Sequence, residues 1–266
     1  QTLYSNISGN NNVAVGYQSL YSNTANNNSA FGYQALKANT IGIGNVAFGD
    51  KALTANTTGS GNSAVGKNSL FNNTIGFSNS AFGYKALEGN TTGSYNASFG
   101  DQALISNTIG SFNNAFGQSA LNLSTTGSYN NAFGRLALRS NTIGNRNNGF
   151  GLYSLYSNVA GTNNTAVGDL SLYSNTTNSN SAFGAQALYE VTTGTLNTAI
   201  GFASGRGITT GSYNTILGAN VTGLSATLAN NIIIADGQGN RRINVDNTGN
   251  VGIGTTGPAT KLEVVG

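Results

Sequence analysis

The chain has 266 residues, of which only 7% are charged, and its 11 Lys and Arg against 8 Asp and Glu give a formal net charge of +3. Basic residues this sparse exclude a nucleic-acid footprint, and no apolar run reaches the roughly 18 residues of a membrane-spanning helix. The absence of Cys and His excludes disulfides, thiolate metal sites and the commonest acid–base catalyst.

A short phrase recurs thirteen times between Asn12 and Gly218. Each copy reads Asn, a variable residue, a small residue, a large apolar residue and Gly, and Leu follows four places later in eleven copies. Ten of the twelve intervals between phrase glycines are 17 residues and two are 16. This period is too short for a helix pair and is typical of one coil of a β-solenoid. We therefore predict an all-β parallel β-solenoid (β-roll) of about thirteen 17-residue coils over residues 1–220.

Each column of the repeat has a predicted place. The phrase and the Ala/Ser–Leu pair after it are both expected to be short strands, with glycine allowing the bend between them. We place the Phe and Leu columns in the interior and the Ala column on the opposite face, where a small residue indicates close approach of another surface. The Asn column is expected to hydrogen-bond along the ladder. The structural repeat residues of two representative coils are Asn79, Phe82, Gly83, Leu87, Asn96, Phe99, Gly100 and Leu104.

Between the Leu and the next phrase lies a turn of the form Asn-Thr-Ile/Thr-Gly, as in residues 39–42. The two 16-residue coils carry Asn26 and Asn178 where we expect this turn glycine. Since Asn tolerates left-handed backbone, we expect a tightened turn there. After Gly218 the repeat dissolves into short apolar runs separated by Asp-Gly, Gly-Asn and Thr-Gly, which predict a β-rich capping or stem segment over residues 221–266.

The inventory of reactive side chains does not favour an enzyme. Asp50, Asp101 and Asp169 each follow a phrase glycine, but at least three coils separate them, too far for a catalytic carboxylate pair. We expect solvated carboxylates, no metal and no cofactor. A basic spot at Arg135, Arg139 and Arg146 is likewise expected to be a solvated face.

Two short aromatic columns are the candidate ligand-binding residues. Stacked tyrosines on an outer face can serve as platforms for sugar rings, although the same columns are equally suited to packing between protomers. One column comprises Tyr156, Tyr173 and Tyr189, and the other comprises Tyr95, Phe112 and Tyr129.

The unit from Asn79 to Leu87 is similar to repeats of phage tail-fibre-like and bacterial surface proteins, and its phrase resembles the repeat of trimeric autotransporter adhesin heads, whose period is shorter. This resemblance covers about residues 10–220. The stretch from Gly249 to Pro258 resembles the one that precedes an intramolecular chaperone in many such fibres. The resemblance implies a homotrimer, an extracellular location on a virion tail fibre or cell surface, and a cell-surface glycan or host receptor as partner.

The expected function is therefore that of a structural fibre segment in a receptor-binding or adhesive surface appendage, without catalysis. A purely structural, self-assembling extracellular filament is the main alternative. A second alternative is ice or surface binding through a Thr column that recurs eleven times from Thr24 to Thr209.

Overall fold

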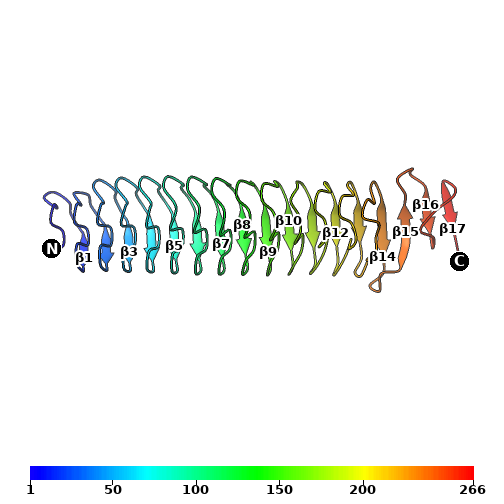
Figure 1. Cartoon of the computed structure of the whole chain (residues 1–266), viewed down its shortest axis with the longest axis horizontal. Helices are drawn as coiled ribbons and strands as arrows, with labels where there is room; N and C mark the ends of the chain where they lie inside the picture. The colour runs from blue at the N-terminus through cyan, green and yellow to red at the C-terminus, as the bar shows by residue number, and fades with distance from the viewer. The chain divides into compact units, whose positions relative to one another are not determined.

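The computed structural model describes all 266 residues and contains seventeen short strands and no helix. It divides into two compact units, Gln1–Ile143 (the N-terminal unit) and Gly144–Gly266 (the C-terminal unit). Within each unit the repeat contributes one three-residue strand per coil, as the succession of arrows in Figure 1 shows. The predicted parallel β-solenoid of about thirteen turns is confirmed.

In the N-terminal unit each strand pairs in parallel with the next, so that equivalent phrase residues face each other, as Phe82 faces Phe99. The strands are β1 (Val13–Val15), β2 (Ser29–Phe31), β3 (Val46–Phe48), β4 (Ser63–Val65), β5 (Ser80–Phe82), β6 (Ala97–Phe99), β7 (Asn114–Phe116) and β8 (Asn131–Phe133).

The C-terminal unit continues the same pattern and then changes direction. Its parallel strands are β9 (Asn148–Phe150), β10 (Thr165–Val167), β11 (Ser181–Phe183), β12 (Thr198–Ile200), β13 (Thr215–Leu217) and β14 (Ile232–Ala235). Three further strands follow, β15 (Arg241–Val245), β16 (Val251–Ile253) and β17 (Leu262–Val264). β15 pairs antiparallel with both β14 and β16, and β17 pairs in parallel with β16.

Strand β14 is a further rung of the ladder, so the prediction that the repeat ends at Gly218 is wrong by one coil. β14 pairs with β13 in the register of the repeat, and the Asn231 backbone N–H donates to Asn214 Oδ1 at 3.1 Å. The phrase glycine is replaced by Ala235. Glycine is needed at Gly218 because a Cβ there would lie 2.5 Å from the Ala235 carbonyl oxygen of the next coil. No further coil follows Ala235, since β15 runs antiparallel to β14.

The second half of each coil consists of turns, and the predicted second strand is wrong. Three positions per coil adopt the left-handed backbone that non-glycine residues rarely adopt, as Lys85, Leu87 and Tyr95 do with φ near 56–59°. Burial of the Leu87 side chain offsets this strain. The phrase glycine is required for two reasons, because Gly100 has φ 140° and a Cβ there would lie 2.6 Å from the Gly117 carbonyl oxygen.

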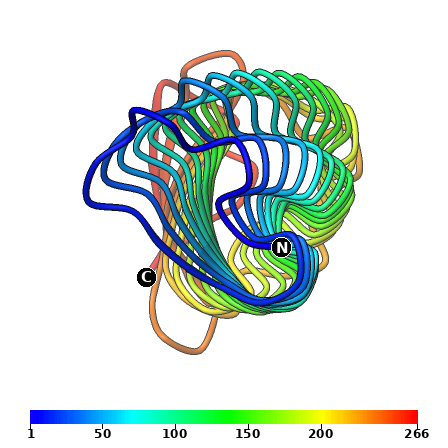
Figure 2. The same cartoon turned by 90° about the vertical axis from the view of Figure 1, so that its left-hand side faces the viewer.

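The interior holds smaller side chains than predicted. In Figure 2 the coils are seen end-on as successive turns of the chain. Their interior holds the Leu column together with two columns of small residues. Ala81, Ala86 and Leu87 are fully buried, whereas Phe82 is exposed. The prediction that Phe fills the core and Ala faces outward is therefore wrong. Successive strand residues point to opposite faces, so burying Ala81 places Phe82 outside.

The Asn residues have the structural role that the sequence predicts. The backbone N–H of the phrase residue Asn62 donates to Asn45 Oδ1 at 3.0 Å, and its own Nδ2 donates to the Gly76 carbonyl at 2.8 Å. The turn residue Asn73 donates through Nδ2 to Asn56 Oδ1 at 2.8 Å and to Gly76 at 2.9 Å. Two buried amide ladders therefore satisfy the polar groups of the turns.

In the two shortened coils, the place of the turn glycine is held by the residue before the Asn that the sequence assigned to it. In the first, Asn23 Nδ2 donates to the Ala25 carbonyl at 2.9 Å, the bond that a turn Asn elsewhere makes to the turn glycine. The left-handed residue is Asn27, with φ 61°, whereas the Asn26 side chain accepts a backbone N–H from the preceding coil. The same places in the second shortened coil are held by Thr177, Asn178 and Ser179.

Candidate functional site

The phrase residues that precede each glycine form an apolar column on the outside of each unit. In the N-terminal unit we name this column the N-terminal stripe, and it contains no polar side chain. Its exposure ranges up to 54% at Val15, and the rings of Phe99 and Phe116 stack with centroids 4.7 Å apart. Its members are Val15, Phe31, Phe48, Val65, Phe82, Phe99, Phe116 and Phe133.

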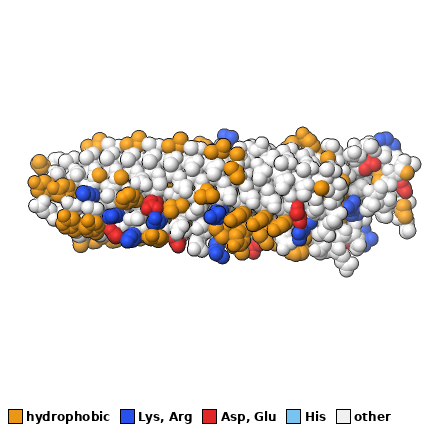
Figure 3. All heavy atoms as spheres, in the orientation of Figure 1, with side chains coloured by type: hydrophobic (Ala, Val, Ile, Leu, Met, Phe, Trp, Pro, Cys, Tyr) orange, Lys and Arg blue, Asp and Glu red, His pale blue; other side chains and the backbone are white.

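The C-terminal unit carries the equivalent column, named the C-terminal stripe. Its members are Phe150, Val167, Phe183, Ile200, Leu217 and Ile234, most of them more than a third exposed. Figure 3 shows hydrophobic side chains gathered in patches on one face of the molecule. The Ala side chains, to which the sequence assigned a contact surface, are buried, and the apolar residue that follows each of them is the one on the outside.

The structure brings together the first predicted aromatic column, here named the tyrosine ladder. The rings of Tyr156 and Tyr173 stack with centroids 5.2 Å apart and planes 4° apart, and those of Tyr173 and Tyr189 stack at 5.1 Å and 7°. All three side chains are partly buried. Since the rings lie face to face, the ladder presents their edges and hydroxyl groups, and not their faces as the sequence predicts.

A fourth tyrosine beside the ladder was missed by sequence reasoning. The Tyr153 ring lies crosswise to Tyr156 and Tyr173, at 65° and 69°, with centroids 5.4 and 6.3 Å away. Tyr153 stands two places after a phrase glycine and has φ 56°. The signal in the sequence is this second tyrosine within the same coil, but only the left-handed turn places it against the ladder.

Arg206 lies at one end of the tyrosine ladder. Its guanidinium group is 5.2 Å from the centre of the Tyr189 ring, forms an ion pair with Glu190, and donates to Gln186 Oε1 at 3.0 Å. Hydrogen bonding to Glu190 raises the pKa of Arg206. Burial raises the pKa of the Tyr173 phenol, and the neighbouring phenols of Tyr156, Tyr189 and Tyr153 raise it further. The four tyrosine rings therefore lie in one group.

The second predicted aromatic column also forms a ladder, in the N-terminal unit. Tyr95 and Phe112 stack at 4.9 Å, as do Phe112 and Tyr129, and all three are between 42% and 51% exposed. Phe77 contacts Tyr95 edge-on at 5.0 Å. These rings stand at the left-handed corner that precedes the phrase Asn, and the middle rung lacks a hydroxyl group.

The Thr hydroxyl groups take part in the turn. Thr57 Oγ1 donates to the Thr74 carbonyl of the next coil at 3.1 Å, and Thr91 Oγ1 donates to the Thr108 carbonyl at 3.0 Å. The column thus reinforces the backbone ladder, and its hydroxyl protons are already donated within the chain.

The charged residues that the sequence singled out do not gather into one site. Asp50 pairs with Lys67 at 3.4 Å, and Asp169 Oδ1 accepts the Leu152 backbone N–H at 2.8 Å. Asp101 is exposed. No three His, Cys, Asp or Glu side chains gather where they could hold a metal ion. In the basic spot, Arg135 Nε donates to Gln118 Oε1 at 3.1 Å.

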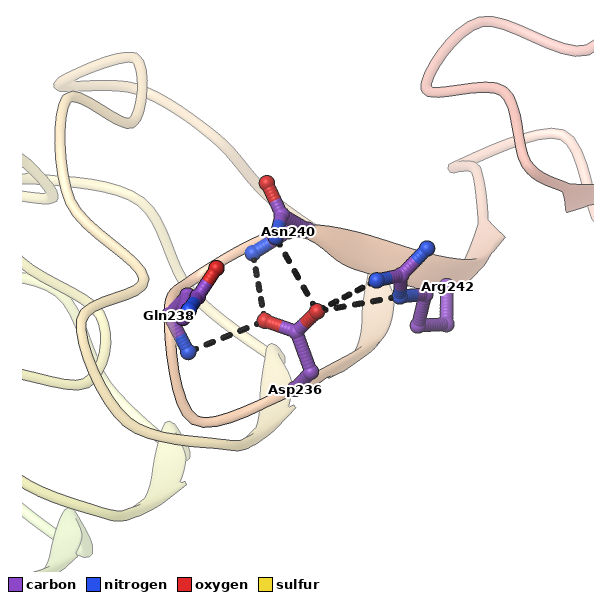
Figure 4. A network of polar contacts seen from close by, with 4 residues as sticks. All are labelled: Asp236, Gln238, Asn240 and Arg242. Carbon is purple, nitrogen blue, oxygen red and sulfur yellow. Dashed lines mark hydrogen bonds and ion pairs between the residues drawn. The ribbon is translucent and has the colours of Figure 1, made fainter.

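Near the C-terminus, one carboxylate closes the turn between β14 and β15. Asp236 accepts the backbone N–H groups of Gln238 and Asn240 at 2.9 and 3.0 Å, and the Asn240 amide and the Arg242 guanidinium donate to it as well (Figure 4). The Asn240 side chain, followed by Arg242 and the two backbone groups, holds the pKa of Asp236 well below its usual range. Asp246 closes the next turn in the same way, so both carboxylates are occupied within the chain.

No pocket opens on the surface, and no helix has the length and apolar content to cross a bilayer. Comparison with protein-family models, curated proteins and solved structures found no match to this chain. The two stripes and the two aromatic ladders are therefore the candidate sites, and each is defined by the arrangement of its side chains.

Proposed function

We propose that the chain is a non-catalytic structural segment of an extracellular receptor-binding or adhesive appendage, tail-fibre-like or adhesin-like, and that it assembles as a homotrimer. The observation that carries this proposal is the uninterrupted apolar stripe on the outside of each unit. The residues that follow β14 act in this proposal as a cap and stem, in which β15 covers the edge of β14.

The size of the N-terminal stripe supports association. With side chains of about 150–250 Å² for the aromatic members, the stripe exposes on the order of 500 Å² of contiguous apolar surface, at the upper end of what a monomer normally shows. Its exposed members lie between 36% and 54% exposed. Covering this surface removes it from water and stabilises the assembly.

The period of the stripe favours a second copy of the same chain as the partner. An apolar group stands at every rung, and rungs are about 4.8 Å apart. A partner that matches every rung needs the same spacing over the same number of coils, which another copy of this chain provides. The number three follows from the resemblance to trimeric fibres.

The mass in solution tests this proposal. Light scattering is expected to give about three times the chain mass of 27.1 kDa. Replacing Phe99 and Phe116 with Lys is expected to yield a folded monomer, because two charges cannot be buried unpaired at an apolar interface. Ile109→Lys is the matched control, since Ile109 is 55% exposed at a turn outside the stripe. A monomeric wild-type chain would contradict the proposal, and open-ended polymers would favour the filament alternative.

A further inference from the structure

We propose that the tyrosine ladder, together with Tyr153 and Gln186, binds a neutral, linear β-1,4-linked glycan that lies along the stacking direction of the coils. This inference rests on the proposed function and names the class of glycan that the appendage recognises.

The spacing of the rings is the first argument. The centroids of Tyr156, Tyr173 and Tyr189 follow one another at 5.2 and 5.1 Å, close to the strand spacing of about 4.8 Å that the ladder imposes. An extended β-1,4-linked glycan advances by nearly the same length per sugar. Each sugar can therefore lie opposite one tyrosine, with alternate sugars turned over, whereas the curved chain of an α-1,4-linked glycan does not keep this match in spacing.

The orientation of the rings is the second argument. The faces of the three ladder rings are turned to each other, so their edges and hydroxyl groups are what a chain along the ladder meets. Tyr153 is the ring whose plane runs along the ladder, at 65° and 69° to its neighbours. It can offer a face to the apolar side of one sugar while the ladder hydroxyl groups bond to the sugar hydroxyl groups.

The charges around the ladder are the third argument. Arg206 lies over the Tyr189 ring, and Glu190 neutralises it. The Gln186 amide oxygen accepts from Arg206, so the amide NH₂ group is the part that can donate to a sugar. A neutral surface rich in hydroxyl and amide groups favours an uncharged polyol over a charged ligand.

The N-terminal unit contains an internal comparison. Its ladder of Tyr95, Phe112 and Tyr129 has nearly the same spacing of 4.9 Å. Phe112 interrupts the row of hydroxyl groups. The same glycan is therefore expected to bind more weakly there.

The test is calorimetric titration of the full chain with a β-1,4-linked glucose hexasaccharide and, separately, with the α-1,4-linked hexasaccharide. Binding of the β-linked sugar alone is expected. Tyr173→Phe removes one hydroxyl group and is expected to weaken binding about fivefold. Tyr173→Ala also breaks the stack and is expected to weaken binding at least about tenfold. Tyr213→Ala is the control, because Tyr213 is 59% exposed in the same unit and outside the ladder.

The outcomes distinguish a failure of the glycan proposal from a failure of the homotrimer proposal. Equal affinity for the two hexasaccharides, or an effect of Tyr213→Ala as large as that of Tyr173→Ala, overturns the glycan inference. A chain with trimeric mass that binds neither sugar overturns this inference alone. A monomeric chain that binds the β-linked sugar overturns the homotrimer alone. The circular dichroism spectrum of Tyr173→Phe is expected to match that of the wild-type chain, which excludes a folding defect as the cause of weaker binding.

Discussion

The turns of the coils and the turns near the C-terminus solve the same problem with different side chains. In the coils, buried amides such as that of Asn73 satisfy the turn, with Nδ2 donating to Asn56 and to Gly76. Between β14 and β15, the half-buried carboxylate of Asp236 accepts two backbone N–H groups of its own turn. One residue is neutral and stacked, and the other is charged and solitary.

The difference follows from stacking. An amide carries both donors and an acceptor, so identical amides can bond to one another rung after rung. Carboxylates accept only, and like charges directly opposite each other destabilise neighbouring strands. A repeated turn therefore needs Asn, whereas an isolated exposed turn can use the stronger charge-assisted bonds of Asp. The low charge of the chain, 7% of residues, is partly a consequence of this rule.

Placing a carboxylate inside the amide ladder is expected to have the largest effect. Asn73→Asp replaces a fully buried donor with an acceptor that faces the oxygens of Asn56 and Gly76. The loss is expected to be about 3–5 kcal/mol, as for other uncompensated buried charges. Denaturant unfolding followed by circular dichroism measures it. The control is the exposed neighbour Asn72→Asp, and an equal loss there would contradict the role given to the ladder.

Completing the amide ladder is expected to stabilise the fold. Ser124 stands where the neighbouring coils carry the turn Asn, and the buried atoms Asn107 Oδ1 and Ser124 Oγ have no hydrogen-bond partner. Ser124→Asn restores the missing donor, and we expect a gain of about 1–3 kcal/mol, the cost of an unsatisfied buried polar group. The unfolding midpoint measures this gain. Ser106→Asn, a partly exposed position of the preceding coil, is the control, and a midpoint unchanged by Ser124→Asn would show that the orphaned atoms cost nothing.

Acid is expected to separate the two kinds of turn, with the smallest effect because the carboxylates of Asp236 and Asp246 remain partly open to solvent. The folded pKa values of Asp236 and Asp246 are lowered by hydrogen bonds. Their contribution to stability is therefore complete above the unfolded pKa of about 3.9, and it is lost as the pH falls through the lowered folded values. The amide ladders carry no titratable group and should not respond.

Nuclear magnetic resonance can follow this transition through the backbone amides of Gln238 and Asn240. Both amide protons are expected to shift and broaden as acid protonates Asp236, while the amide of Asn62 in the coils stays in place. Asp236→Asn should abolish the transition at these two amides and leave that of Asn250 beside Asp246. A transition that survives Asp236→Asn would assign the effect to another group.

The candidate site was predictable only in part. The spacing of Tyr156, Tyr173 and Tyr189 in the sequence is enough to place them in one column, because the period fixes the register of the ladder. Tyr153 and Arg206 were missed, since their contacts depend on left-handed turns and on long side chains that reach across coils. The ring faces could not be assigned either, as the tilt of a side chain is set by its neighbours.

The sequence by itself determined the period, the β-solenoid and the structural role of the Asn and Gly columns, because exact repetition leaves one stacking register and each of these residue types has one function in it. Only the tertiary structure decided which side of the strand faces inward. Alternation along β5 offers either Ala81 or Phe82 to the interior, and hydrophobicity alone selects Phe82. The left-handed turn directs the Leu87 side chain inward, where it fills the narrow coil. The strand can therefore supply only the methyl group of Ala81, and the ring of Phe82 is left outside.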